Sequence, residues 1–440
     1  MSRRKILGLM IIGSCLAATA APAKDSVVGF KVEEPSASSA ERLTAPSPEA
    51  PKTAKQSVVG QKTLKADKKA ESSAPAPAPA PAPEVKAEAP KELKTAGYDK
   101  GFFIQSPDGK YKIVFTGYAQ FHLEYDREEG KNTVGFRVRR ARLTWAGNLA
   151  GKNLTYKFQI DLVKFKDELL LDAYMNYKFY EALEVRFGQF TMPWIRQHQI
   201  SSSAQEFVDR SLASNEFLIF HDTDSDKDGV PDKRIRNGRD VGLMIHGKPF
   251  EKKLEYQAGI FNGSGTNSLN INNHMVYAAR AVYNIRGEAG YEEGDYAYTE
   301  DPAVYFGSSG NYFVSDLTND KVTQFGAETG LKWKGLALQG EFFYRNSKPG
   351  DTTLTTTNDY GYYAQAGYFV LKKKLELAAR ASMVFLEGIQ NDKGEFQAGL
   401  NYFILGQYLK MQTDYSVLPT NTKDGVQTAQ KWRLRLQAKF

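Results

Sequence analysis

Arginine side chains are concentrated in the stretch FRVRRARLTWAG, Phe136–Gly147, which holds four arginines in six consecutive positions. A guanidinium stays charged at any physiological pH, and its planar fork donates paired hydrogen bonds to carboxylate or phosphate oxygens. Side chains alternate along a strand, so Arg140 and Arg142 are predicted on one face and Arg139 and Trp145 on the other. A soluble core strand would not tolerate this much charge, so the stretch predicts a strand between a polar and an apolar environment.

The same alternation recurs in many segments after Tyr98. In the final stretch, KWRLRLQAKF, Arg433 and Arg435 share one face, and Trp432 and Phe440 share the other. Strands that contact hydrocarbon on one side and water on the other show this pattern, and a closed barrel satisfies every backbone group in lipid. We therefore predict an all-β fold, a transmembrane antiparallel β-barrel of about sixteen strands, with aromatic side chains near the strand ends.

The connections between the predicted strands alternate in length. LAGKN, YEA, FEKK and LKKK are short, whereas DREEGKNT, GSGTNSLNINNH, SKPGDTTLTTTND and PTNTKDGVQTAQ are long. Short periplasmic turns and long external loops are typical of membrane barrels. The pattern is weakest between Arg286 and Asn319, where Glu, Gly and Asp interrupt it. A soluble β-sandwich or lectin-like domain would also alternate, but it would not explain the aromatic last residue, Phe440, which barrel-assembly machinery recognises in outer-membrane proteins.

Three regions are predicted along the chain. Residues 1–23 have a basic start, a short apolar run and small residues at the end, which is the pattern of a cleaved signal peptide. The only cysteine, Cys15, lies in this region; a lipidated cysteine is the alternative to a discarded one. Residues 24–97 are rich in Ala, Pro and Lys and predict a disordered periplasmic linker, and residues 98–440 predict the outer-membrane barrel.

The net charge of the chain does not by itself indicate an anion channel. The protein has a formal net charge of +7, but residues 98–440 contain 43 basic and 41 acidic side chains. Any preference for anions must therefore come from local placement of charge. No basic patch accompanies a nucleic-acid-binding fold signal, and the five histidines show neither metal-site nor triad spacing, so we expect neither a nucleic-acid partner nor an enzyme.

One acidic motif, DTDSDKDGVPD, has the spacing of a calcium-binding loop. Acidic residues at positions one, three, five and nine, with Gly229 at six, match the ligand positions of an EF-hand, but Ile235 stands where its final Glu would be. A solvated acidic loop tip is the alternative. The sequence requires no cofactor, but it predicts Ca²⁺ binding in this loop. The predicted ligands are Asp224, Asp226, Asp228, Val230 and Asp232.

Several stretches together resemble the phosphate-selective porin O and P family. They are DGKYKIVFTGYAQF, FRVRRARLTWAGNLAGKNLTYKFQID, LDAYMNYKFYEALEVRFGQFTMPW, SSSAQEFVDRSL and DVGLMIHGKPFEKKLEYQAGIFNG, in order over about residues 101–263. The resemblance implies a sixteen-stranded barrel, a homotrimer, and a third external loop, about residues 194–238, that folds inward to narrow the pore. It also implies that arginines of the wall and of this loop line the constriction. The predicted anion-selectivity residues are Arg140, Arg142, Arg196, Arg210, Arg234, Arg236, Arg239, Arg433 and Arg435.

The function implied is passive diffusion of small anions, phosphate or polyphosphate first, across the outer membrane. One alternative is a weakly selective general porin, in which acids such as Asp161, Asp172 and Glu124 pair with the arginines and leave little selectivity. Another is a barrel whose linker tethers the envelope, with peptidoglycan as partner. The expected surroundings are outer-membrane lipids and lipopolysaccharide.

Overall fold

The computed structural model describes residues 93–165, 169–223, 233–270, 273–387, 392–423 and 425–440. The chain divides into two units, Met1–Val85 and Lys86–Phe440, and all described residues belong to the second. The predicted signal peptide and nearly all of the predicted linker therefore lie outside the described residues. Among the residues described, no helix is both long enough and apolar enough to cross a membrane.

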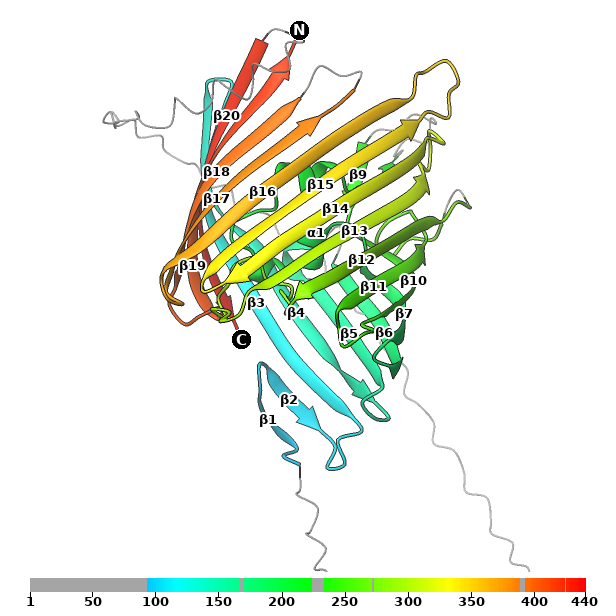
Figure 1. Ribbon diagram of the computed structural model, residues 1–440, viewed down its shortest axis with the longest axis vertical. Coiled ribbons are helices and arrows are strands. Elements are labelled where there is room, and N and C mark those ends of the chain that lie inside the picture. Colours follow the sequence, from blue (N-terminus) through cyan, green and yellow to red (C-terminus); the bar gives the residue numbers. More distant parts are fainter. Residues whose placement is uncertain (1–92, 166–168, 224–232, 271–272, 388–391, 424) are drawn as a thin grey trace, which may run out of the picture. The chain divides into compact units, whose positions relative to one another are not determined.

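Sixteen antiparallel strands close into a barrel, which confirms the predicted fold (Figure 1). Closure is made by β20 against β3, where Trp432 lies opposite Tyr125 and Leu436 opposite Phe121. A short hairpin, β1 (Ala96–Tyr98) and β2 (Phe102–Gln105), continues the sheet along β3 below the C-terminus. The barrel strands are β3 (Lys112–Glu128), β4 (Lys131–Leu149), β5 (Leu154–Asp161), β6 (Leu170–Tyr180), β7 (Leu183–Thr191), β10 (Arg239–Gly247), β11 (Leu254–Phe261), β12 (Val276–Arg286), β13 (Ala303–Val314), β14 (Lys321–Trp333), β15 (Leu336–Lys348), β16 (Thr357–Leu371), β17 (Leu375–Phe385), β18 (Lys393–Phe403), β19 (Leu409–Thr422) and β20 (Gly425–Lys439).

Inward and outward faces alternate along the strands as the sequence predicts. On β20, Arg433 and Arg435 point inward and are buried, whereas Trp432 and Leu436 point outward and are 38% and 44% exposed. Large apolar side chains on the outer wall would be costly in water, but in a membrane they contact hydrocarbon. The outer surface of this barrel is therefore built to face lipid.

A β-bulge in β4 changes the predicted facing of one arginine. Arg140 lies opposite Gln120, but the next residue of β3, Phe121, lies opposite Val138, so Arg139 is an extra residue without a partner. A bulge interrupts the two-residue alternation and re-aims a side chain. The guanidinium of Arg139 accordingly lies 3.6 Å from the carboxylate of Asp209 inside the barrel, and its predicted lipid-facing position was wrong.

Two of the predicted long loops are strand extensions instead. The stretch DREEGKNT continues β3 to Glu128 and β4 from Lys131, joined by a tight turn at Glu129 and Gly130. Both turn residues have positive φ, 51° and 77°, as the twist-matched two-residue hairpin turn requires. In PTNTKDGVQTAQ, β19 likewise runs to Thr422. Reading a polar run as a loop was wrong here, because strands that extend beyond the membrane have water on both faces.

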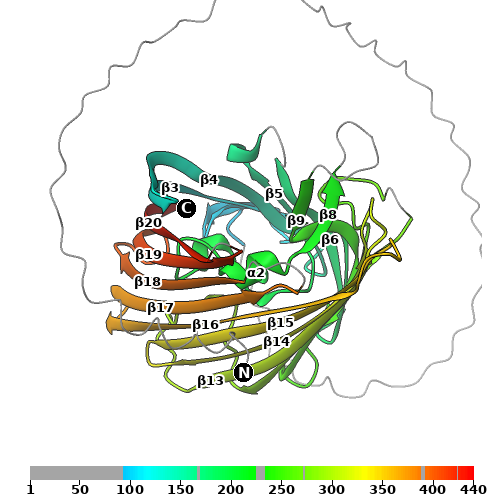
Figure 2. The same cartoon turned by 90° about the horizontal axis from the view of Figure 1, so that it is seen from above.

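The connection between β7 and β10 spans residues 192–238, and we call it L3. Its described parts, residues 192–223 and 233–238, fold into the barrel as the resemblance implied (Figure 2). It contains α1 (Arg196–Gln199), the 3₁₀ turn η3 (Ser202–Ala204), α2 (Leu212–Glu216), and the hairpin β8 (Ile219–Thr223) and β9 (Lys233–Asn237). Apolar L3 side chains pack on the inner wall; for example, the ring of Phe217 stacks on Phe343 with 5.6 Å between centroids. The predicted wet interior is therefore wrong for part of the wall. These contacts belong to one apolar cluster, whose buried wall residues are Phe190, Met244, Phe261, Val276, Ala278, Phe313, Val322, Phe343, Tyr363 and Val384.

One of the two barrel rims carries mostly short turns, and a single long connection lies among them. Residues 150–153, 181–182 and 372–374 are such turns, but residues 287–302 between β12 and β13 are much longer. This long turn coincides with the region where the sequence pattern was weakest. Its Glu293 and Asp295 are 1% exposed, so the turn folds into the protein rather than into solvent.

The cost of charge on the outer wall should depend on depth. Ala364 and Val370 lie on the same outward face of β16, near its middle and near its end. Because Arg at the bilayer midplane costs about 2–4 kcal/mol and near the interface about 0–1 kcal/mol, Ala364→Arg should destabilise the barrel more than Val370→Arg. Denaturant unfolding in lipid vesicles measures both variants against the parent. Equal costs at the two positions would contradict the assignment of this face to lipid.

Candidate functional site

Three arginines from two wall strands converge on one carboxylate of L3. Asp209 lies 3.6 Å from Arg139, 3.5 Å from Arg140 and 3.2 Å from Arg433, measured from guanidinium nitrogen to carboxylate oxygen. Arg139 and Arg140 come from β4 and Arg433 from β20, which lie on either side of β3. The arginines of β4 and β20 therefore form a basic stripe across the barrel closure, and L3 meets it with an acid.

A cavity of about 270 Å³ opens beside Asp209 between L3 and the wall. Five of its lining side chains are cationic and two are acidic, so its walls carry a net positive charge. This volume is well above the roughly 10–15 Å³ that a single water needs by the same measure, so the cavity can hold a hydrated oxyanion. The lining residues are Arg139, Arg140, Asp209, Arg210, Leu212, Asn215, Glu395, Leu418, Lys431 and Arg433.

Arg210 is the lining cation with the least charge compensation. It donates hydrogen bonds from Nε to the carbonyl of Gln197 at 2.9 Å and from Nη2 to the carbonyl of Ile200 at 3.2 Å. No carboxylate lies within ion-pair distance of it among the described residues. Burial, with repulsion from Arg140 and Arg142, lowers the pKa of Arg210, although a guanidinium remains protonated at neutral pH. A mobile anion would supply the charge that the protein does not.

Two further arginines of the stripe are used to hold structure. Arg142 donates from Nε to Asp161 at 2.9 Å and from Nη1 to the hydroxyl of Ser202 at 3.2 Å. Arg435 is fully buried; it donates to His122 at 2.9 Å and to the carbonyl of Val208. Both guanidinium groups therefore fasten L3 to the wall next to the cavity rather than line it.

The structure does not bring the remaining predicted arginines to this cavity. Arg196 is buried. Its guanidinium lies 3.4 Å from the carboxylate of Glu328 and 4.0 Å from the ring centroid of Tyr305. Arg236 pairs with Glu216, and Arg239 donates to Asp172 at 2.7 Å. Arg234 belongs to β9, and its side chain lies outside the described set. Sequence spacing alone could not separate these arginines from those of the cavity.

Carboxylates gather on the opposite side of L3. Glu328 on β14, Glu341 on β15 and Glu376 on β17 all point inward and are buried. The carboxylate of Glu341 accepts hydrogen bonds from the backbone N–H groups of Arg196 at 2.8 Å and Gln197 at 3.0 Å. L3 therefore meets arginines at β4 and β20 on one side and these carboxylates at β14–β17 on the other, where the buried cations Lys332, Arg345 and Arg380 also lie.

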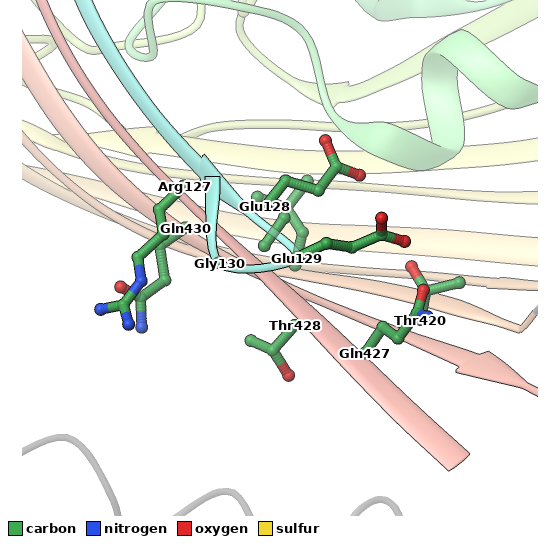
Figure 3. Close-up of a pocket in the computed structure, with 10 residues that line it drawn as sticks. Arg127, Glu128, Glu129, Gly130, Thr420, Gln427, Thr428 and Gln430 are labelled. Carbon is green, nitrogen blue, oxygen red and sulfur yellow. The ribbon is translucent and has the colours of Figure 1, made fainter. Parts of the chain in front are cut away.

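A larger cavity, of about 420 Å³, lies at the extended ends of β3, β19 and β20 and at the turn between β3 and β4 (Figure 3). Its charged lining residues are Arg127, Glu128 and Glu129, so acids outnumber bases there. In Figure 3 the side chains of Glu128 and Glu129 point away from that of Arg127. With this charge balance, we do not assign anion binding to that cavity.

Some functional positions were missed from the sequence, and one predicted site is not described. Arg139 was missed because a bulge cannot be located from alternation, and Asp209 and Lys431 because only folding brings L3 to the closure strands. The predicted calcium ligands Asp224–Asp232 lie outside the described residues. Within the described residues, no group of three or more His, Cys, Asp or Glu side chains is arranged to hold a metal ion.

A closed sixteen-stranded barrel with an apolar outer wall and a loop folded into its interior is the architecture of an outer-membrane porin. The chain belongs to the phosphate-selective porin O and P family, whose model matches residues 115–440. This family and fold are those of channels.

Individual proteins with similar sequence or structure agree with the fold. An uncharacterized protein of Aquifex aeolicus (strain VF5) is 23% identical over 368 residues, which cover 72% of this chain and 84% of that protein. The structure of an anion-selective porin from Comamonas acidovorans has a TM-score of 0.54 at 11% identity, covering 75% of this chain and 100% of that chain. OmpTdeltaL8, a loop L8 deletion mutant of OmpT from Vibrio cholerae, has a TM-score of 0.52 at 11% identity, with coverage of 75% and 100%.

Removing the charge of Asp209 should loosen L3. In Asp209→Asn the three facing arginines lose their shared counter-charge, and we expect a loss of about 1.5–3 kcal/mol in the free energy of unfolding. The midpoint of denaturant unfolding in detergent micelles measures it. Asp301→Asn is the control, because the Asp301 side chain is 86% exposed and pairs only at the rim with Arg286.

The pH dependence of this effect has a defined sign. Burial opposes ionisation of Asp209, but the attraction of Arg433, Arg140 and Arg139 is stronger and lowers its pKa. The stabilisation is therefore present above the ordinary Asp pKa of about 4 and is lost as pH falls toward the lowered value. Identical unfolding midpoints for the parent and Asp209→Asn at neutral pH would contradict the role given to this carboxylate.

Proposed function

We propose that this protein is an outer-membrane channel for passive diffusion of small anions, with inorganic phosphate or polyphosphate as the preferred class. The observation that carries the proposal is the cavity beside Asp209, whose five cationic lining side chains outnumber its two acidic ones. Arg433 also pairs with Asp414 at 2.8 Å, so the excess of positive charge comes mainly from Arg139, Arg140 and Arg210. Cationic side chains at a narrow part of a pore favour anions, and guanidinium forks suit the oxygens of phosphate. The anion selectivity in the printed name of the Comamonas acidovorans porin agrees with this class of solute.

Asp209 gives the proposed site a way to release its anion. Arg139, Arg140 and Arg433 already share this carboxylate, so an arriving phosphate exchanges with it instead of meeting unpaired charges. Conduction needs binding that is weak enough for the solute to leave. The resident carboxylate therefore lowers the affinity of the site and keeps the anion mobile.

A weakly selective porin is the second candidate, and a specific observation favours it. Most of the inward arginines named above are paired, such as Arg142 with Asp161 at 2.9 Å and Arg239 with Asp172 at 2.7 Å. Neutralised pairs shape the wall but give little net field. The two candidates differ in whether the unpaired charge near Arg210 is large enough to discriminate ions.

Other parts of the proposal follow from the family or the sequence. Homotrimer formation and Ca²⁺ binding at Asp224–Asp232 remain predictions, as does an envelope contact through residues 24–97. Recognition of Phe440 by the barrel-assembly machinery is a further proposal. It is supported by the position of this residue, which pairs with Gly117 through both backbone groups and packs on Phe115 at 5.5 Å between ring centroids.

Loss of two cavity arginines should reduce anion selectivity. In Arg140→Ala/Arg210→Ala the chloride-to-potassium permeability ratio should fall by a factor of roughly five, since partly screened charges contribute about 1 kcal/mol. The reversal potential of planar bilayers in a KCl gradient measures this ratio. Arg286→Ala is the matched control, because this arginine pairs with Asp301 on the rim, and its side chain is 61% exposed. An unchanged ratio in the double variant would remove these arginines from the selective set.

Phosphate should block the chloride current if the site prefers it. We expect half-block at about millimolar phosphate, the affinity of roughly −4 kcal/mol that still permits rapid release. The measurement is chloride conductance during titration with inorganic phosphate, and equal ionic strength of sulfate tests the preference between oxyanions. The block should disappear in Arg140→Ala/Arg210→Ala. A parent channel without block would favour the weakly selective porin.

A further inference from the structure

L3 and the long turn 287–302 are joined inside the barrel, although they start from opposite rims. The backbone N–H of Glu293 donates to the carbonyl of Ala204 at 3.1 Å. In return, the carboxylate of Glu293 accepts from the backbone N–H of Glu206 at 2.8 Å and from Gln197 Nε2 at 2.9 Å. The turn therefore supports L3 from the short-turn rim, and release of this contact would widen the passage there.

Two buried glutamates next to this junction face each other without a donor between them. Glu206 of L3 accepts from Gln365 at 2.8 Å, and Glu376 of β17 accepts from Asn401 at 2.8 Å, each through Oε2. Their Oε1 atoms are both buried and have no hydrogen-bond partner among the described residues. Glu206 is 3% exposed and Glu376 is 2% exposed.

The two Oε1 atoms occupy the same small space between two glycines. A Cβ added to Gly367 would overlap Oε1 of Glu206 and lie 3.2 Å from Oε1 of Glu376. A Cβ added to Gly294, in the long turn, would overlap Oε1 of Glu376 and lie 3.4 Å from Oε1 of Glu206. If both carboxylates were ionised, their neighbouring Oε1 atoms would repel each other and could only accept hydrogen bonds. A single shared proton lets one carboxyl group donate to the other.

The surrounding charges do not neutralise the pair. Glu293 adds a third carboxylate from the long turn. Lys332 of β14 donates to the carbonyl of Glu292 at 2.7 Å, and Lys410 of β19 donates to the carbonyl of Gln205 at 3.3 Å. Neither lysine is within ion-pair distance of Glu206 or Glu376 among the described residues. Lys410 is repelled by Arg435 of β20 and attracted more weakly by Glu376 and Glu293. Burial first, then Glu376 and Glu293, raise the pKa of Glu206 well above its usual range.

We propose that Glu206 and Glu376 share one proton and form a latch that holds L3 on β17, next to the long turn, so that channel conductance rises as pH increases. When the shared proton passes to water, two facing carboxylates remain and push L3 from the wall. Because the pKa of this loop carboxyl is raised, the latch is present at pH values below the raised pKa and is lost as pH rises through it. This inference goes beyond anion selectivity, which depends on the other side of L3.

The test is single-channel conductance of the full chain in planar bilayers containing KCl, from about pH 5 to about pH 9, the range in which buried glutamates titrate. The parent should conduct more at the upper end. Glu376→Gln supplies a permanent amide donor to Glu206, so its conductance should stay low and flat over the whole range. Glu300→Gln, in the same turn but with a 76% exposed side chain, should behave as the parent.

Gly367→Ala provides the opposite change, because its methyl group would displace the Glu206 carboxyl and should raise conductance already at about pH 5. Heat-modifiable migration on gels establishes that each variant is a folded barrel. A parent conductance independent of pH, or an unaltered pH response in Glu376→Gln, would overturn the latch. Reversal potentials recorded in the same experiment report anion selectivity separately, so failure of the latch and failure of the proposed function are distinguishable.

Discussion

The hydrogen bonding of a loop inside a barrel is the constraint on which the rest of this structure depends. Backbone groups buried away from water must find partners, and L3 has little regular structure of its own to supply them. Side chains of the wall take this role. Asp414 accepts from the N–H of Val208 at 2.8 Å, Glu395 from that of Leu212 at 2.9 Å, and the N–H of Ala213 donates to Ser382 at 3.0 Å. The inward polar residues of the strands are thus the partners of a specific loop path.

This arrangement also divides the charges of the pore. The side of L3 that faces β4 and β20 meets arginines. The side that faces β14–β17 meets glutamates with the cations Lys332, Arg345 and Arg380 among them, and an apolar cluster around Phe217 and Phe343. Because the barrel as a whole is close to electroneutral, this separation creates a local field that the net charge does not show. A solute that passes beside Asp209 encounters an excess of positive charge.

The fold was predictable because the bilayer imposes a simple pattern. Each membrane-crossing strand needs apolar residues outside and polar residues inside, so alternation around Trp432 and Arg433 revealed both faces of the last strand. The errors arose where that constraint is absent. Beyond the membrane, at Glu129 and Gly130, polar composition no longer distinguishes a loop from a strand. At Arg139 a single inserted residue changed the facing of a charged side chain.

The sequence by itself determined the strand pattern, the family and the set of arginines from which a pore lining could be drawn. Only the tertiary structure decided which of them remain available, because each arginine is neutralised or left unpaired by residues distant in the chain. Arg142 meets Asp161 and Arg196 meets Glu328, whereas Arg210, in the part of the chain that the structure describes, donates to carbonyl oxygens. Electrostatic interactions fall off with distance through space rather than along the chain, so these pairings could not be obtained from spacing.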